Sequence, residues 1–467
     1  MFPGLTLGYW LTLHGLVTVV AVLFYIVTSR LLHQRRHPTA AIAWVLFILL
    51  MPYVALPAFL TFGSRKQARP RTPALPAPAG VALHGSWAAQ TALALGQPAP
   101  AAYHALRLHA QGAEALGALR EIIAQAEHSL DVCTFILGND ALGSEIVQRL
   151  CAKARAGVRV RLLLDGMGRL LGGRPNLKPL GAAGVELKLF VPPLHSPLKG
   201  RTNLRNHRKL LIADAAHATT RRVWSGGRNL ACEYFEGAPG KPAWHDLSFD
   251  LRGALVEQAS RLFEHDWAFA HGHKAQLGVA AACEAPALAA PGAQLLASGP
   301  DQVEDTVHAL LVTAAYRAAQ RLQLVTPYFV PDAALLMALC LAARRGVQVD
   351  LLLPARSNHR FSDLARRRAL RTLSDAGGRI WLVPHMLHAK LAVVDDVVAF
   401  SGSANLDSRS LFLNYELMFA FHDAQAIAAY SGWFERERAL ATPHLPQRPG
   451  LAGDMADGLV LWLGFQL

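Results

Sequence analysis

Two groups of polar residues in this sequence share one spacing and carry side chains suited to phosphoryl transfer. A histidine, a lysine two positions later and an aspartate five positions after that occur twice: His207, Lys209 and Asp214, then His388, Lys390 and Asp395. A neutral imidazole can attack phosphorus, and a protonated one can deliver a proton to a leaving alkoxide. Ammonium groups can hold a phosphodiester and supply the charge stabilisation a metal would give, so we expect neither a metal nor another cofactor.

Each motif is followed by a short glycine-containing phrase that ends in asparagine. The first is Gly226-Gly227-Arg228-Asn229, and the second is Gly402-Ser403-Ala404-Asn405. Small residues let backbone amides approach a phosphate closely, and an asparagine side chain can donate to it. Four residues are therefore candidate substrate-binding groups: Gly227, Asn229, Ser403 and Asn405.

An apolar segment follows the lysine of each motif, and we expect it to form a strand that sets the direction of the histidine and lysine side chains. Residues 210–212 follow the first lysine and 391–394 follow the second, and both runs are apolar. Alternate side chains on a strand share a face, so each histidine should point the same way as its lysine. By the same count Asp214 and Asp395 face the opposite side, which predicts a structural or orienting role for both carboxylates.

The elements around the motifs are also duplicated. The phrases Ala-Arg-Ala-Gly-Val at 154–158 and Ala-Arg-Arg-Gly-Val at 343–347 each precede an apolar strand. We expect helices over 113–126, 143–156, 303–319 and 333–345, and strands over 130–136, 158–164, 322–329 and 347–353. Alternating helices and strands predict an α/β fold with largely parallel, helix-covered sheets.

The N-terminal region has the pattern of a membrane anchor. Residues 9–28 and 40–62 are apolar and long enough to span a bilayer, and a short basic loop separates them. No cleavable signal precedes them, so residues 1–66 are expected to form an uncleaved two-helix transmembrane hairpin. A Pro/Ala-rich linker is expected over 67–105, a first domain over 106–280, a second linker over 281–296 and a second domain over 297–467. The apolar tail at 459–465 is too short to span.

Composition and isolated residues limit the possible partners. A net charge of +13 and a 52% hydrophobic fraction indicate an anionic partner, either a lipid surface or nucleic acid. The five cysteines lack the spacing of a disulfide framework or a zinc site. His217, His245 and His385 lie near the motifs, but no carboxylate or cysteine stands beside them at ligand spacing, which predicts bystander histidines rather than a metal site.

The sequence resembles the phospholipase D superfamily, whose mark is a duplicated HxKxxxxD motif, and within it the bacterial cardiolipin synthases. Besides the two motifs, the resemblance rests on residues 298–301, on Thr-Pro-Tyr-Phe-Val-Pro at 326–331 and on Gly-Ser-Ala-Asn-Leu-Asp at 402–407. It implies two similar α/β/α sandwich domains that share one active site, and a multi-pass protein of the bacterial inner membrane. The basic residues on the two flanks of the apolar runs nearly balance, with a slight excess after the second run that favours soluble domains in the cytoplasm.

The resemblance also implies residue roles. His207 is the expected nucleophile, forming a covalent phosphatidyl-histidine, and His388 is the expected general acid and base. Acidic residues beyond each asparagine orient the imidazoles: Asp246 in the first half and Glu416 in the second.

We therefore expect a phosphatidyltransferase that moves a phosphatidyl group from phosphatidylglycerol to a second phosphatidylglycerol and releases glycerol. The alternatives are a hydrolytic phospholipase D that yields phosphatidic acid, a phosphodiesterase acting on nucleic acid, and a catalytically idle membrane scaffold. The apolar N-terminus and the lack of a basic groove interleaved with aromatic residues argue against a nucleic-acid partner. The intact histidines and lysines argue against the scaffold.

Overall fold

The computed structural model describes residues 7–31, 38–62, 86–192, 203–272 except 239, 292–450 except 303 and 448, and residue 453. The first half of the chain contributes strands β1 (Ala101–His109), β2 (Ser129–Thr134), β3 (Arg159–Leu164), β4 (Glu186–Leu189), β5 (Leu210–Ala213), β6 (Arg222–Gly226) and β7 (Ser248–Gly253). The second half contributes β8 (Gly292–Ser298), β9 (Arg321–Val325), β10 (Phe329–Val330), β11 (Gln348–Pro354), β12 (Arg379–Val383), β13 (Leu391–Val394), β14 (Val398–Gly402), β15 (Leu406–Asp407), β16 (Glu416–Phe421) and β17 (Thr442–Pro443).

Fifteen of these strands form one mixed sheet across the described part of the chain. Its order is β17-β12-β11-β9-β13-β14-β16-β8-β1-β7-β6-β5-β2-β3-β4, while β10 and β15 pair separately. The series β1-β7-β6-β5-β2-β3-β4 repeats as β8-β16-β14-β13-β9-β11-β12, so the two halves are the same unit built twice. They join edge to edge where β1 pairs antiparallel with β8, at Ala101↔Ala293 and Ala102↔Gly292.

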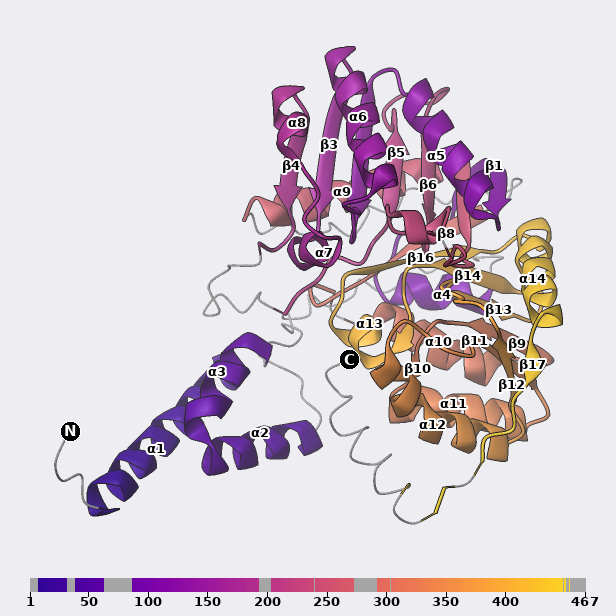
Figure 1. Cartoon of the computed structure of the whole chain (residues 1–467). Coiled ribbons are helices and arrows are strands. Elements are labelled where there is room, and N and C mark those ends of the chain that lie inside the picture. Colours follow the sequence, from indigo (N-terminus) through magenta and orange to yellow (C-terminus); the bar gives the residue numbers. More distant parts are fainter. Residues whose placement is uncertain are drawn as a thin grey trace.

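Helices cover both faces of each half. Those before and within the first half are α1 (Leu7–Leu31), α2 (Pro38–Leu50), α3 (Pro52–Phe62), α4 (Trp87–Ala94), α5 (Gly112–Gln125), α6 (Ala141–Arg155), α7 (Gly166–Leu171), α8 (Lys178–Ala182), the 3₁₀ turn Cys232–Tyr234 and α9 (Leu255–Ala270). Those of the second half are α10 (Thr306–Arg317), α11 (Ala333–Arg344), α12 (Arg360–Asp375), α13 (Ser408–Phe412) and α14 (Ala424–Ala439). Figure 1 shows α5 and α6 over the first half, and α10, α11 and α12 on the opposite side of the molecule under the second.

Three hydrophobic cores hold these layers together. One packs α5 and α6 on the first half, another packs α10, α11 and α12 on the second, and the third combines α9 and α14 with strands of both halves. Strand β13 shows why its residues suit this position. Leu391 and Val393 lie in the shared core, whereas Ala392 and Val394 lie in the core of the second half, as expected for alternate faces of a strand buried on both sides.

The duplicated helices and strands predicted from the sequence are all present, with ends shifted by a few residues. The prediction of largely parallel sheets was wrong. Among the described residues, the strands that pair in parallel are β2-β3-β4, β9-β11-β12 and the small β10-β15 pair, and three isolated bridges are parallel as well. The strands that carry the motifs, β5 and β13, run antiparallel to both neighbours. Short turns, 214–221 in one half and 395–397 in the other, follow these strands, and such turns can join only antiparallel strands.

The predicted linkers were too long. Within 67–105, helix α4 packs against the second-half core and β1 belongs to the sheet, while 67–85 lies outside the described residues. Within 281–296, residues 292–296 are part of β8. Both ranges look like linkers because they are rich in alanine and proline, yet small apolar residues also pack closely in a core. The apolar tail at 459–465 lies outside the described residues.

The N-terminal helices form a small unit beside the sheet, with its own core of Ala21, Tyr25, Ile48, Ala55 and Phe59 (Figure 1). Helix α1 coincides with the first predicted span, but the second is divided into α2 and α3 at Met51. Proline at 52 has no N–H to continue the helical hydrogen bonding, which accounts for this break. Among the residues that the structure describes, no helix has the length and apolar character needed to cross a bilayer.

Candidate active site

The two motif histidines are each paired with a carboxylate from the opposite half of the chain. His388 Nδ1 lies 2.7 Å from Asp246 Oδ2, and His207 Nδ1 lies 3.2 Å from Glu416 Oε1. Both carboxylates are completely buried. We expected each acid to serve the histidine of its own half, and that prediction was wrong. The crossed pairs place both histidines at the boundary between the halves.

Backbone contacts fix this crossing. The amide of His207 donates to Tyr415 O (2.9 Å), and the amide of His388 donates to His245 O. The corresponding bridges, Asn206↔Tyr415 and His245↔Leu387, are parallel, and each precedes a paired histidine and carboxylate. The residue before each histidine thus lies beside the residue before its carboxylate, so the pseudo-symmetry of the fold sets both pairs.

The electrostatics keep both imidazoles neutral at neutral pH in the ligand-free protein. Burial lowers the pKa of His207, and the positive charges of Lys209 and Lys390 lower it further, against the opposing effect of Glu416. Burial, Lys390 and Lys209 lower the pKa of His388 to about 3, although Asp246 acts in the opposite direction. Because each lysine influences both histidines, the four groups share one electrostatic environment.

The lysines themselves are buried. Burial lowers the pKa of Lys209 to about 8, despite the favourable charges of Glu416 and Asp246. Burial and the neighbouring Lys209 lower the pKa of Lys390 to about 7, although Asp246 opposes this. The Nζ of Lys390 lies 2.9 Å and 3.0 Å from the two ring nitrogens of His388. Burial destabilises the charged form of both lysines, and a bound anion would stabilise it.

The motif aspartates have a different position. Asp214 accepts hydrogen bonds from the backbone amides of Glu127, His128 and Ser129, and Asp395 accepts from the amides at 319, 320 and 321. Both have positive φ, 50° and 47°, in the turn after their strand. Aspartate tolerates this conformation better than most residues. Each carboxylate fastens the motif turn to the start of the neighbouring strand, away from its histidine, as the alternation along the strand predicts.

The glycine-containing segments contact the buried carboxylates Asp246 and Glu416. The amide of Gly227 donates to Leu247 O and that of Ser403 donates to Leu417 O, so neither is available to a ligand as expected from the sequence. A Cβ on Gly227 would lie 2.2 Å from Asp246 Oδ1. The Ser403 hydroxyl lies 2.5 Å from Glu416 Oε2 and donates to it. The two positions are equivalent in the two halves: Gly227 leaves room for Asp246, and Ser403 donates a hydrogen bond to Glu416.

The two asparagines are buried beside the motifs. Asn229 Oδ1 accepts from the amide of Ile136 at 3.3 Å. Asn405 Nδ2 donates to Ser410 Oγ at 3.3 Å, and within the described ranges its Oδ1 has no hydrogen-bond partner. A buried amide that is only partly satisfied can still turn toward a ligand, so Asn405 stays a candidate for substrate contact.

Sequence reasoning missed several residues around the histidines. Arg208, the variable residue of the first motif, is fully buried; it donates to Glu416 O (3.0 Å) and Ser298 O (3.1 Å) and pairs with Asp266. The second motif has Ala389 at this position, and that asymmetry was the available signal. Aromatic rings also line the site: Phe135 lies 4.8 Å from His207, and Tyr234 lies 5.1 Å from His388, between ring centroids.

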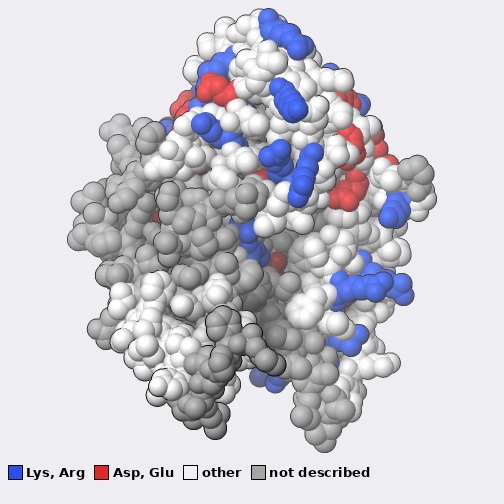
Figure 2. All heavy atoms as spheres, turned by 60° about the vertical axis from the view of Figure 1, so that its left-hand side comes forward, with Lys and Arg blue, Asp and Glu red and all other residues white. Residues whose placement is uncertain are grey.

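Figure 2 shows the molecule hollowed between its two halves, with Lys and Arg atoms at the hollow and more basic than acidic atoms on this face. An anionic ligand would therefore meet a favourable potential as it approaches the boundary where the histidines lie.

Known proteins resemble this chain over nearly its whole length. The family model described as "Cardiolipin synthase, PLD-like domain" matches residues 119–267 and 311–438, and the model "Phospholipase_D-nuclease N-terminal" matches residues 17–64. The chain belongs to the cardiolipin synthase family of the phospholipase D superfamily. Cardiolipin synthase A of Pseudomonas putida (strain W619) is 31% identical over 443 residues, covering 88% of this chain and 87% of that protein. The enzyme of the same name from Shigella boydii serotype 4 is 30% identical over 472 residues, covering 95% and 94%.

One solved structure shares the fold. A phosphatidylserine synthase from Haemophilus influenzae superimposes with a TM-score of 0.64 over 81% of this chain and all of that chain, at 14% sequence identity. Family membership and the paired motifs make this protein an enzyme, a phosphatidyltransferase of the phospholipase D superfamily.

Proposed function

We propose that the enzyme makes cardiolipin from two phosphatidylglycerol molecules through a covalent phosphohistidine. The observation that carries this proposal is the pair of crossed histidine–carboxylate contacts, with both motif lysines buried beside them. In our proposal this arrangement supplies one nucleophile, one proton carrier and two cations to a single phosphate.

In the first step Nε2 of His207 attacks the phosphorus of phosphatidylglycerol. Glu416 accepts the hydrogen on Nδ1, which leaves the Nε2 lone pair free. The P–N bond forms, the bond from phosphorus to the glycerol oxygen breaks, and His388 gives its proton to that oxygen. Glycerol leaves with this proton, and the phosphatidyl group stays on His207.

The second step reverses these transfers with a new alcohol. A hydroxyl of a second phosphatidylglycerol loses its proton to neutral His388, and its oxygen attacks phosphorus as the P–N bond breaks. Cardiolipin is released and His388 is protonated again. Asp246 holds the ring and stabilises the imidazolium throughout.

Substrate charge couples binding to catalysis. In the ligand-free protein, Lys209 and Lys390 lower the pKa of His388. A phosphodiester anion between the lysines offsets their charge, so the pKa of His388 rises when substrate binds. The enzyme thus gains its proton donor when there is a leaving group to protonate.

The N-terminal helices support a site at a membrane. Large apolar side chains on α1 to α3 are exposed, among them Leu16 (62%), Leu23 (55%) and Leu50 (75%). Such a surface is costly in water and favourable in a bilayer. We propose that this unit anchors the enzyme by inserting these apolar side chains into the bacterial cytoplasmic membrane, with anionic phospholipid around it. There the lipid alcohol has a high effective concentration, which favours transfer over hydrolysis.

The test is a product assay on full-length protein in phosphatidylglycerol vesicles, with the products resolved by mass. Cardiolipin and glycerol in equal amounts support the proposal. Phosphatidic acid as the only lipid product would make the enzyme a hydrolase, and cleavage of added DNA without lipid turnover would make it a nuclease. Sedimentation with vesicles, lost when Leu16 and Leu23 are changed to Asp, tests the membrane anchor separately.

A further inference from the structure

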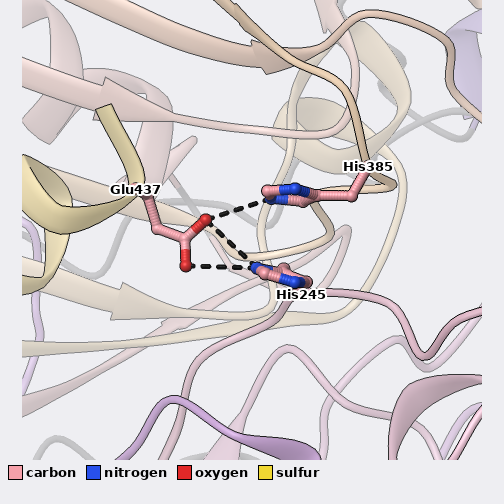
Figure 3. Close-up of side chains that lie close together, drawn as sticks. All are labelled: His245, His385 and Glu437. Carbon is pink, nitrogen blue, oxygen red and sulfur yellow. Dashed lines mark hydrogen bonds and ion pairs between the residues drawn. The ribbon is translucent and has the colours of Figure 1, made fainter. Parts of the chain in front are cut away.

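A second group of ligating side chains lies beside the active site and plays no part in the reaction above. His245 Nδ1 lies 3.2 Å from both carboxylate oxygens of Glu437, and His385 Nε2 lies 3.1 Å from Glu437 Oε2. Figure 3 shows both rings turned toward this carboxylate. The sequence predicted bystander histidines because no carboxylate stands at ligand spacing beside them, but in the structure Glu437 reaches His245 and His385 from helix α14, far along the chain.

We propose that His245, His385 and Glu437 form a Zn²⁺ site that joins the two halves of the enzyme. One nitrogen of each ring and one carboxylate oxygen lie within 4.8 Å of one another. Two imidazoles and a carboxylate are a common ligand set for zinc, with a fourth position left to water.

The distances suit a tetrahedral ion. Zinc binds histidine nitrogen and carboxylate oxygen at about 2.0–2.2 Å, so the edges of a regular tetrahedron of ligands are about 3.3–3.6 Å. The nitrogen–oxygen distances of 3.1 Å and 3.2 Å are slightly shorter than these edges. A small outward movement of the two rings would therefore admit the ion.

The two rings stack beside the carboxylate. The centroids of His245 and His385 are 3.5 Å apart and the rings are inclined by 24°. Each ring directs one nitrogen at Glu437, and in a neutral imidazole such a nitrogen carries the lone pair that binds a metal.

Access and position point to a structural role. The side chain of His245 is 36% exposed, whereas those of His385 and Glu437 are 15% and 11% exposed, so an ion can enter from one side. His245 belongs to the first half of the chain and the other two ligands to the second. His245 also accepts a backbone hydrogen bond from His388 and directly precedes Asp246. The ion would therefore hold together the strand bridge that carries the Asp246–His388 pair.

The experiment is a zinc titration of untagged full-length protein that has been stripped with EDTA. We expect one tight site per chain in competition with a chromophoric chelator, and a melting temperature raised by roughly 3–5 °C at saturation. Co²⁺ at the same site should give the intense visible bands of a tetrahedral complex.

Two variants separate this site from adventitious binding. Glu437→Gln keeps the size of the side chain but loses its charge and one acceptor oxygen, so it should weaken Zn²⁺ at least about tenfold and abolish the thermal shift. His217→Ala alters the other stacked histidine pair, His128–His217 (centroids 3.7 Å apart), and should change neither. Absence of a tight site in the parent protein, or equal affinity in parent and Glu437→Gln, would overturn the proposal.

These readouts do not depend on lipid turnover. The stripped protein should still make cardiolipin, since His207, His388 and both lysines are unchanged. A protein that binds zinc without making cardiolipin would refute the proposed function alone, and one that makes cardiolipin without binding zinc would refute the metal site alone.

Discussion

Replacing Asp246 with asparagine tests the crossed arrangement of the active site. Asp246 is buried, and although burial alone would raise its pKa, His388, Lys390 and Arg228 lower it to about 2, so it is ionised at neutral pH. Asparagine keeps the shape but loses the charge that stabilises the imidazolium of His388 during proton transfer.

The expected loss follows from the geometry. The nitrogen–oxygen distance is 2.7 Å, which places the centres of the two charges about 4 Å apart. At an effective dielectric constant of about 20, their attraction is worth about 4 kcal/mol. That corresponds to about 3 pKa units, or up to about a thousandfold in rate. Initial rates of glycerol release should therefore fall by about 10²–10³-fold in Asp246→Asn.

Asp250→Asn is the matched control. Asp250 is also buried and paired, with Arg222 (2.8 Å) and His109 (2.7 Å), but it lies on β7 away from the histidines of the motifs. This variant should lower the melting temperature and leave kcat nearly unchanged. Activity within threefold of the parent in Asp246→Asn, or an equal loss of kcat in Asp250→Asn, would refute the reasoning.

Other substitutions separate groups that act on substrate from groups that hold the backbone. Asp214→Ala should lower the free energy of unfolding by about 2 kcal/mol, measured by denaturant, with kcat little changed, because three backbone amides lose a charged acceptor. Gly227→Ala should cost at least about a hundredfold in initial rate by displacing Asp246, whereas Ser403→Ala, which removes one hydrogen bond, should cost about tenfold or less. Lysine is charged below its pKa, and that of Lys390 is about 7, so KM for phosphatidylglycerol should rise as pH increases above 7 and stay flatter in Lys390→Arg. A large loss of kcat in Asp214→Ala would contradict the first prediction. Equal losses of rate in Gly227→Ala and Ser403→Ala would contradict the second. A KM for phosphatidylglycerol that does not change with pH in the parent enzyme would contradict the third.

Much of this site was accessible from the sequence because the signal was local. The HxK spacing identifies the histidines and lysines, and alternation along a strand separates Asp214 and Asp395 from them. Asp214 and Asp395 both have a positive φ and make the same contacts with backbone amides, so the two motifs look alike in the sequence and in the fold.

The sequence could not predict that each carboxylate pairs with the histidine of the other half. Glu416 lies 209 residues beyond His207, and Asp246 lies 142 residues before His388. Only the pseudo-symmetric joining of the halves at β1 and β8 brings these pairs together. The same holds for Arg208 and Glu437, whose partners come from distant elements.

The prediction of largely parallel strands was wrong for another reason. Alternating helices and strands usually indicate parallel sheets, and β2, β3 and β4 follow that rule. The turns after β5 and β13 are too short to hold a helix that covers the sheet, and the antiparallel part of each half begins at these strands. The turn lengths after Asp214 and Asp395 held this information.

The most direct test of the central claim is to trap the covalent intermediate. His388→Ala removes the proton carrier but leaves the nucleophile, so brief incubation with phosphatidylglycerol under mildly acidic conditions should let the adduct form slowly and persist. We predict that peptide mapping finds a phosphatidyl group on His207, absent in the double variant that also carries His207→Ala. An adduct on another residue, or continued turnover without His207, would contradict the account.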